Sequence, residues 1–244
     1  MPRPLVLSRL YPAASAIHGR LLLLLLFIAA MAVLENGGDR WWADHLYALQ
    51  GGSWRYRDAW WTSQLLHTGG KWLSVGASVL VAAGALWAWL RPGRAHWRRP
   101  LIYLLLSVAL STSLVSLIKS TSAVACPWDL TRYGGQQPWL GLIQAWQTHG
   151  PVGGCFPAGH ASAGYAWLAL YFLAAAHAPQ WRWPALLLGL GLGACFGLAQ
   201  QLRGAHFASH DLASLALCWL CARTLAGWLL PPALPPTQTP ALNA

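Results

Sequence analysis

Charged residues are scarce in this sequence. Only 9% of its 244 residues are Asp, Glu, Lys or Arg, whereas ordinary soluble domains carry about a quarter. Apolar residues make up 56%, 17 residues are Trp, and the mean hydropathy is +0.41. This composition excludes both a soluble globular domain and an intrinsically disordered chain. We therefore expect a membrane protein.

Acidic residues are the rarest of the charged types. Six Asp and Glu stand against sixteen Lys and Arg, which leaves a formal net charge of +10. A nucleic-acid-binding protein would gather such an excess on one water-facing element. Here the basic residues lie between long apolar runs, so the excess does not indicate nucleic acid as a partner.

Long apolar runs organise the chain. A helix needs roughly 17 to 25 apolar residues to cross about 30 Å of hydrocarbon. Six runs fit this requirement, at residues 20–35, 72–90, 101–118, 161–178, 184–202 and 211–230. We expect the first run to be a retained helix rather than a cleaved signal peptide, because no small-x-small site closes it before Glu35 and five more runs follow. The sequence predicts an all-α, polytopic membrane protein: a six-transmembrane-helix bundle forming one domain over residues 1–230, with a disordered cytoplasmic tail over residues 231–244.

The distribution of arginine predicts the orientation. An even number of spans puts both termini on one side, and the positive-inside rule assigns the arginine-rich segment 91–100 and both termini to the cytoplasm. That side carries nine basic residues against seven outside, and all six acidic residues fall outside. We expect a bacterial inner-membrane protein whose active site faces the periplasm.

Two outer segments are long. Residues 36–71 interleave tryptophans with charged residues, a pattern typical of interfacial helices, for which an aromatic anchor is the simpler interpretation. For His67 and Lys71 we likewise favour a place at the interface over one in the site. Cys126 and Cys155 share the second outer segment, where an oxidising periplasm allows either a disulfide or two free thiols.

Three outer segments, residues 119–132, 155–162 and 200–211, place titratable groups at span ends, which indicates a common polar site. Gly159 stands at a predicted helix start, whose free N–H groups and positive dipole end suit a phosphate. His160 in the same turn is either a general acid or a capping histidine.

The third segment contains the candidate nucleophile. A neutral His206 imidazole can attack phosphorus if an acceptor fixes its other ring N–H. His210, one helical turn away, is the better placed partner, and Asp211 is the chemically better one. The candidate ligands of the phosphoryl oxygens are three cations, namely Lys119, Arg132 and Arg203.

The order and spacing of these residues resemble the type 2 phosphatidic acid phosphatase superfamily. Its signature is K-x6-R-P, then P-S-G-H, then S-R-x5-H-x3-D, on six helices with the site at the outer face. The resemblance covers residues 20–230, and the matching positions are Lys119, Pro127, Pro157, Gly159, His160 and His206. It implies that His206 is the nucleophile, His160 the general acid and Lys119 a phosphate ligand.

The sequence also departs from that signature. Cys126 stands for the first arginine, Ala158 for the serine, Ala199 and Gln200 for the Ser-Arg pair, and His210 for the aspartate. Arg132, Arg203 and Asp211 lie close enough in sequence to restore the missing groups, so we expect a divergent branch that has rebuilt its phosphate site.

We therefore expect a phosphatase that acts on a lipid phosphate or pyrophosphate through a phosphohistidine, with no cofactor and no metal. Lipid A, undecaprenyl pyrophosphate, phosphatidic acid and phosphatidylglycerophosphate all remain open as the substrate. One alternative is a metal-dependent hydrolase with His206 and His210 as ligands. Another is an inactive relative that only binds a lipid phosphate. A transporter is unsupported, because the predicted spans hold few polar residues.

Overall fold

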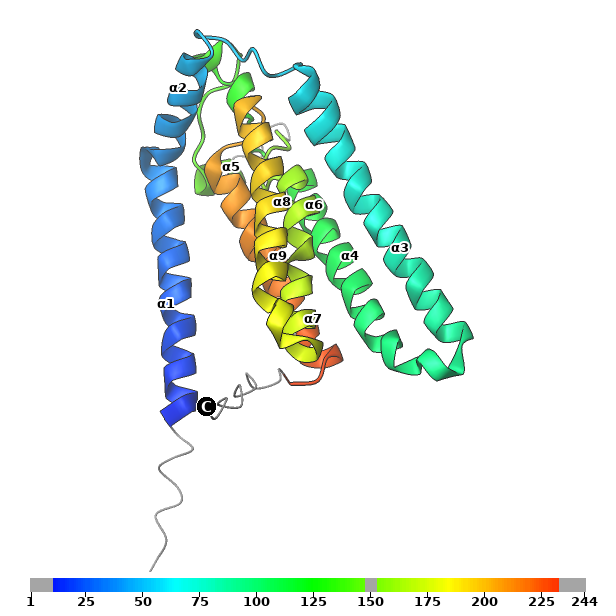
Figure 1. Cartoon of the computed structure of the whole chain (residues 1–244). Helices are drawn as coiled ribbons and strands as arrows, with labels where there is room; N and C mark the ends of the chain where they lie inside the picture. Colours follow the sequence, from blue (N-terminus) through cyan, green and yellow to red (C-terminus); the bar gives the residue numbers. More distant parts are fainter. Residues whose placement is uncertain (1–10, 148–152, 233–244) are drawn as a thin grey trace, which may run out of the picture.

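The computed structural model describes residues 11–147 and 153–232, and these are helical with no strand. Most of the expected cytoplasmic tail, residues 233–244, lies outside the described residues. The long helices are α1 (Tyr11–Val33), α3 (Gly70–Leu90), α4 (Arg98–Thr121), α8 (Arg182–Leu202) and α9 (Ala208–Leu229). Shorter ones are α2 (Asp39–Leu49), α5 (Leu142–Gln147), α6 (Gly159–Tyr165) and α7 (Ala169–His177). Helix α1 begins at the same end of the bundle at which α9, the last helix, ends (Figure 1).

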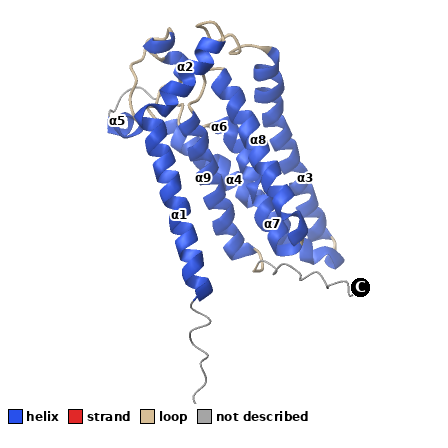
Figure 2. Ribbon diagram, turned by 60° about the vertical axis from the view of Figure 1, so that its left-hand side comes forward, coloured by secondary structure: helices blue, strands red, loops and turns tan. Residues whose placement is uncertain are grey.

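Within the described residues, five helical stretches are long and apolar enough to cross a membrane, at Leu21–Leu49, Trp61–Leu90, Pro92–Thr121, Pro179–Leu202 and Ala208–Leu229. The fourth expected span, residues 161–178, is instead divided. A 3-10 turn at Ala166–Leu168 separates α6 from α7, although the two follow one another along α8 (Figure 2). The protein is thus an all-helical protein with several membrane-spanning helices, and the count of six stays a prediction.

Glycine lets the central helices approach closely. A Cβ built on Gly164 of α6 would lie 2.6 Å from the Cα of Gly193 and 2.6 Å from the carbonyl carbon of Leu192, both on α8. A Cβ on Gly189 would lie 2.8 Å from the backbone nitrogen of Leu168. Lipid tails are as apolar as the helices, so close backbone packing of this kind is a main source of helix association in membranes. It fixes α6, and with it His160, against α8.

Helix α1 stands apart from the other helices in both views (Figures 1 and 2). Its leucines from Leu21 to Leu26 are each more than half exposed. A π-helical segment, Leu34–Gly38, joins α1 to α2, with a kink at Asn36 and Gly37, where the glycine has φ 133°. An apolar surface of this kind suits contact with lipid.

The outer segments pack into a cap over one end of the bundle. Tyr47 and Trp54 meet Tyr133 with ring centroids 5.2 and 5.4 Å apart, and Trp42 donates from Nε1 to Gln201 at 2.6 Å. Trp41 and Trp60, by contrast, are 60% and 68% exposed. Only part of the tryptophan set is therefore free to act as an anchor, and an interfacial position of these helices stays a prediction.

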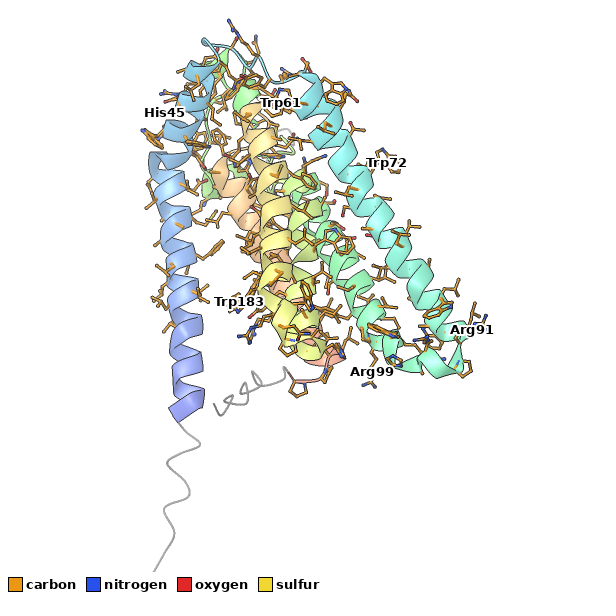
Figure 3. All side chains as sticks on the ribbon, in the orientation of Figure 1. His45, Trp61, Trp72, Arg91, Arg99 and Trp183 are labelled. Atoms are coloured by element: carbon orange, nitrogen blue, oxygen red, sulfur yellow. A yellow bond between two sulfur atoms is a disulfide. The ribbon has the colours of Figure 1, made fainter. Side chains whose placement is uncertain are left out.

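The two ends of the bundle carry different residues. His45 and Trp61 lie at the capped end, whereas Arg91 and Arg99 lie at the end where α3 turns into α4 (Figure 3). The expected orientation, with the arginine-rich segment 91–100 in the cytoplasm, depends on this separation of the arginines from the capped end.

Candidate active site

The three titratable segments meet beneath the cap. Lys119 lies in the last turn of α4, His160 in the first turn of α6, and His206 in the turn between α8 and α9. Charge on Lys119 acts on both imidazoles, and His160 also acts on His206. A Cβ on Gly159 would lie 3.8 Å from Lys119 Nζ, so the glycine leaves room around the ammonium group at the start of α6. The fold therefore brings together residues separated by up to 87 positions in sequence.

His206 is buried and held on one edge of its ring. Its side chain is 6% exposed, and its Nδ1 lies 3.4 Å from Nδ1 of His210. The backbone of Cys155 hydrogen-bonds to both imidazoles. Burial, and next the neighbouring His210, hold the pKa of His206 well below its usual 6.5. The ring is thus neutral at physiological pH, as a nucleophile must be.

Asp211 belongs to a different network from His206. Its carboxylate accepts a short hydrogen bond from Gln201, whose own amide oxygen accepts from Trp42. Gly197 of α8 makes room for this carboxylate, since a Cβ there would overlap it. The structure therefore brings His210 to His206 and turns Asp211 towards α8 and α2.

Asp39 of α2 anchors the first turn of α9. This aspartate is 1% exposed, and its Oδ1 accepts from the backbone N–H of Ser209 at 3.0 Å. A carboxylate at a helix N-terminus satisfies a free N–H group and complements the helix dipole. It thereby helps to fix the turn that carries His206 and His210.

His160 has an unexpected partner. Its Nε2 donates to the backbone carbonyl of His67 at 2.6 Å, and the two rings stack with centroids 3.6 Å apart at 12°. The expectation that His67 lies only at the interface is therefore wrong: its half-buried ring joins the cluster. Sequence reasoning missed this contact because His67 belongs to no motif and lies 93 residues from His160.

Two residues near the end of α8 form a second polar group. Arg203 donates from Nη1 to Gln200 Oε1 at 3.2 Å and from Nε to the carbonyl of Arg57 at 2.7 Å. Its charge acts on both His67 and His160. Gln200 is 3% exposed, and its Nε2 has no partner among the described residues. A buried amide donor of this kind needs an acceptor, so Gln200 is a further candidate ligand that the sequence analysis did not select.

Arg132 is engaged elsewhere. Its guanidinium forms a two-pronged pair with Asp44 at 2.7 and 2.6 Å, and the hydroxyl of Tyr133 donates to the same carboxylate at 2.9 Å. The Arg132 side chain is 56% exposed. This geometry makes Arg132 a link between α2 and the second outer segment, and we do not carry it forward as a phosphate ligand.

A disulfide joins Cys126 to Cys155, with their Cα atoms 5.2 Å apart. It links the loop that follows Lys119 to the loop that precedes His160. Cys126 occupies the position of the first arginine in the family signature, so a covalent link stands where that signature has a charge. Because the backbone of Cys155 contacts His206 and His210, the disulfide restrains the surroundings of the candidate nucleophile.

The described part of the chain shows no group of side chains suited to bind a metal ion. Within residues 11–147 and 153–232, no three His, Cys, Asp or Glu side chains are grouped so that they could hold an ion. His206 and His210 are close, but their Nδ1 atoms face one another.

Comparison with known proteins agrees with this geometry. The family model of the PAP2 superfamily matches residues 100–231, more than half of the chain and all three segments of the site. No curated protein and no solved structure matches the chain. The matched region runs from α4 to α9 and contains Lys119, His160 and His206. The chain therefore belongs to the PAP2 superfamily, that of the type 2 phosphatidic acid phosphatases.

Proposed function

We propose that this protein hydrolyses the phosphate monoester or pyrophosphate of a lipid, at the periplasmic face of a bacterial inner membrane, through a phosphohistidine. One observation supports the proposal: the charge of Lys119 acts on both His160 and His206, which come from distant segments of the chain. Membership of a phosphatase family and several apolar helices support the reaction class and the membrane setting.

His206 is the proposed nucleophile. Its Nδ1 faces Nδ1 of His210, so Nε2 is the nitrogen that we assign to the attack on phosphorus. A P–N bond forms as the P–O bond to the leaving group breaks. Lys119, Arg203 and the free amide of Gln200 are the proposed donors to the phosphoryl oxygens.

His160 is the proposed proton donor. Burial, and after it the charges of Lys119 and Arg203, lower its pKa. A bound phosphate dianion offsets those two charges and favours the imidazolium form. With Nε2 donating to the His67 carbonyl, Nδ1 carries the proton to the leaving oxygen. Neutral His160 then takes a proton from the water that cleaves the P–N bond, which restores both histidines.

Substitution of the nucleophile tests this proposal. His206→Ala should abolish phosphate release, because it removes the nitrogen that forms the proposed phosphohistidine. The matched control is His177→Ala, which removes an exposed histidine at the end of α7, away from the segments of the site. Release of phosphate from lipid A, undecaprenyl pyrophosphate, phosphatidic acid and phosphatidylglycerophosphate in detergent would identify the substrate. Full turnover by His206→Ala would overturn the assignment.

A second arm separates the alternatives. Phosphohistidine chemistry should survive EDTA, whereas a metal-dependent hydrolase should lose activity and recover it when metal is added. An inactive relative should bind the lipid phosphate without releasing phosphate from any of the four lipids. The missing signature arginines, replaced by Cys126 and Gln200, are the observation that keeps this last alternative in the test.

A further inference from the structure

The π-helical segment Trp61–Gly69, which leads into α3, places a histidine on the candidate general acid. Within it, the ring of His67 stacks on that of His160 at a centroid distance of 3.6 Å, and the rings are nearly parallel at 12°. The backbone carbonyl of the same residue accepts from His160 Nε2 at 2.6 Å. One residue therefore fixes both the plane of the His160 ring and the identity of its proton-bearing nitrogen.

The local backbone explains how one residue makes both contacts. In a regular α-helix each carbonyl accepts from the N–H four residues later, and π-helical turns, which break this pattern, occur frequently at functional sites. Here the carbonyls of Leu66 and His67 both face the N–H of Gly70, and the His67 carbonyl also receives the imidazole of His160. The irregular backbone thus leaves this carbonyl accessible to a side chain from α6.

A close helix contact holds the segment in place. A Cβ on Gly70 would lie 2.7 Å from the ring of Phe196 on α8, so a larger residue at this position would displace that ring, and glycine lets α3 start close to α8. Three cations, Lys119, Lys71 and Arg203, act on both imidazoles of the stack. The stack therefore lies among the cations of the candidate site.

We propose that His67 is a positioning residue for the general acid, holding the His160 imidazole so that Nδ1 points to the leaving oxygen. This inference rests on the proposed function. His67 itself exchanges no proton with the substrate: its carbonyl receives the Nε2 hydrogen, and its ring excludes other orientations of His160. A flat ring at position 67 is the feature that the role requires, and a titratable one is not.

Leaving-group dependence tests the role. General acid catalysis matters for a poor leaving group such as the alcohol of phosphatidic acid, and little for 4-nitrophenolate, which departs without a proton. His67→Ala should lower kcat/KM for phosphatidic acid by about 10²-fold, and kcat/KM for 4-nitrophenyl phosphate by less than about 5-fold. The ratio kcat/KM is compared because it includes only the steps up to departure of the leaving group, whereas kcat also includes cleavage of the P–N bond, in which His160 is the base for both substrates. His67→Phe keeps a flat ring and should restore most of the lost activity. Leu65→Ala, which removes a 53% exposed side chain from the same segment, is the matched control.

The outcomes are distinguishable. An equal loss of kcat/KM on the two substrates would overturn the inference, because it would show a general structural effect, and so would an unchanged kcat/KM for phosphatidic acid in His67→Ala. Failure of His67→Phe to recover activity would also count against it. The ¹⁵N chemical shifts of His160 give a readout without turnover: wild type and His67→Phe should keep the hydrogen on Nε2. In His67→Ala the backbone carbonyl stays but the stacked ring is gone, so the His160 ring should turn away from that carbonyl and give a tautomer mixture. Failure of the proposed function would appear separately, as full phosphate release by His206→Ala.

Discussion

The substitution Gly164→Ala, which adds one methyl group to α6, should lower the activity although it changes no residue of the candidate site. Gly164 lies one helical turn after His160, and a Cβ there would lie 2.6 Å from backbone atoms of Leu192 and Gly193. Carbon atoms prefer separations of about 3.5 to 4.0 Å. Gly164→Ala must therefore move α6 away from α8 by about 1 Å, since the obstructing atoms are backbone and cannot rotate aside.

The magnitude follows from that displacement. Overpacking of this kind typically costs about 1–3 kcal/mol of stability. A shift of about 1 Å in a catalytic group can cost about 10²-fold in rate, and here the shifted group is His160. We therefore expect Gly164→Ala to lose about 10²-fold in kcat, together with a lower unfolding temperature in detergent.

Gly191→Ala is the matched control. Gly191 is on α8, and a Cβ there would meet nothing within 4 Å. Alanine is the better helix former by up to about 1 kcal/mol, so this variant should be as stable as wild type or slightly more so. Phosphate release and thermal unfolding, measured in parallel, check both variants. Wild-type activity and stability in Gly164→Ala would refute the argument that contact between α6 and α8 positions His160.

Two further predictions concern the disulfide and pH. Replacing Cys126 and Cys155 by Ser should lower the free energy of unfolding by about 3–4 kcal/mol, the value of the chain-entropy model for a separation of 29 residues. It should also lower kcat, because the backbone of Cys155 contacts His206 and His210. Denaturation and phosphate release check this against Cys195→Ser, an exposed free thiol, and unchanged values would contradict it. Burial lowers the pKa of His206, so the unfolded chain binds its proton first, and stability should fall as pH drops below about 6.5. Thermal unfolding at pH 7.5 and 5.5 measures this slope, which His206→Asn should reduce; greater stability at pH 5.5 would count against a buried neutral imidazole.

The sequence by itself determined the class of the protein and selected most residues of its candidate site. Low charge and long apolar runs require helices in a membrane, because a spanning segment must satisfy its backbone hydrogen bonds internally. Motif spacing selected Lys119, Gly159, His160 and His206, which the fold places at one end of the bundle. Periodicity could not show the break between α6 and α7, because both pieces are apolar and the 3-10 turn between them contains no proline or glycine.

Only the tertiary structure decided the partners of these residues. In the sequence, Arg132 was as suitable a phosphate ligand as Arg203, and Asp211 as suitable a partner for His206 as His210. In the structure, Arg132 pairs with Asp44, and Asp211 accepts from Gln201. The ring of His67, which belongs to no motif, stacks on that of His160. Spacing along the chain places residues on one helix or one loop, whereas the choice of a polar partner depends on which helices lie side by side. That choice is made by packing, here by the glycines that let α6 and α3 approach α8.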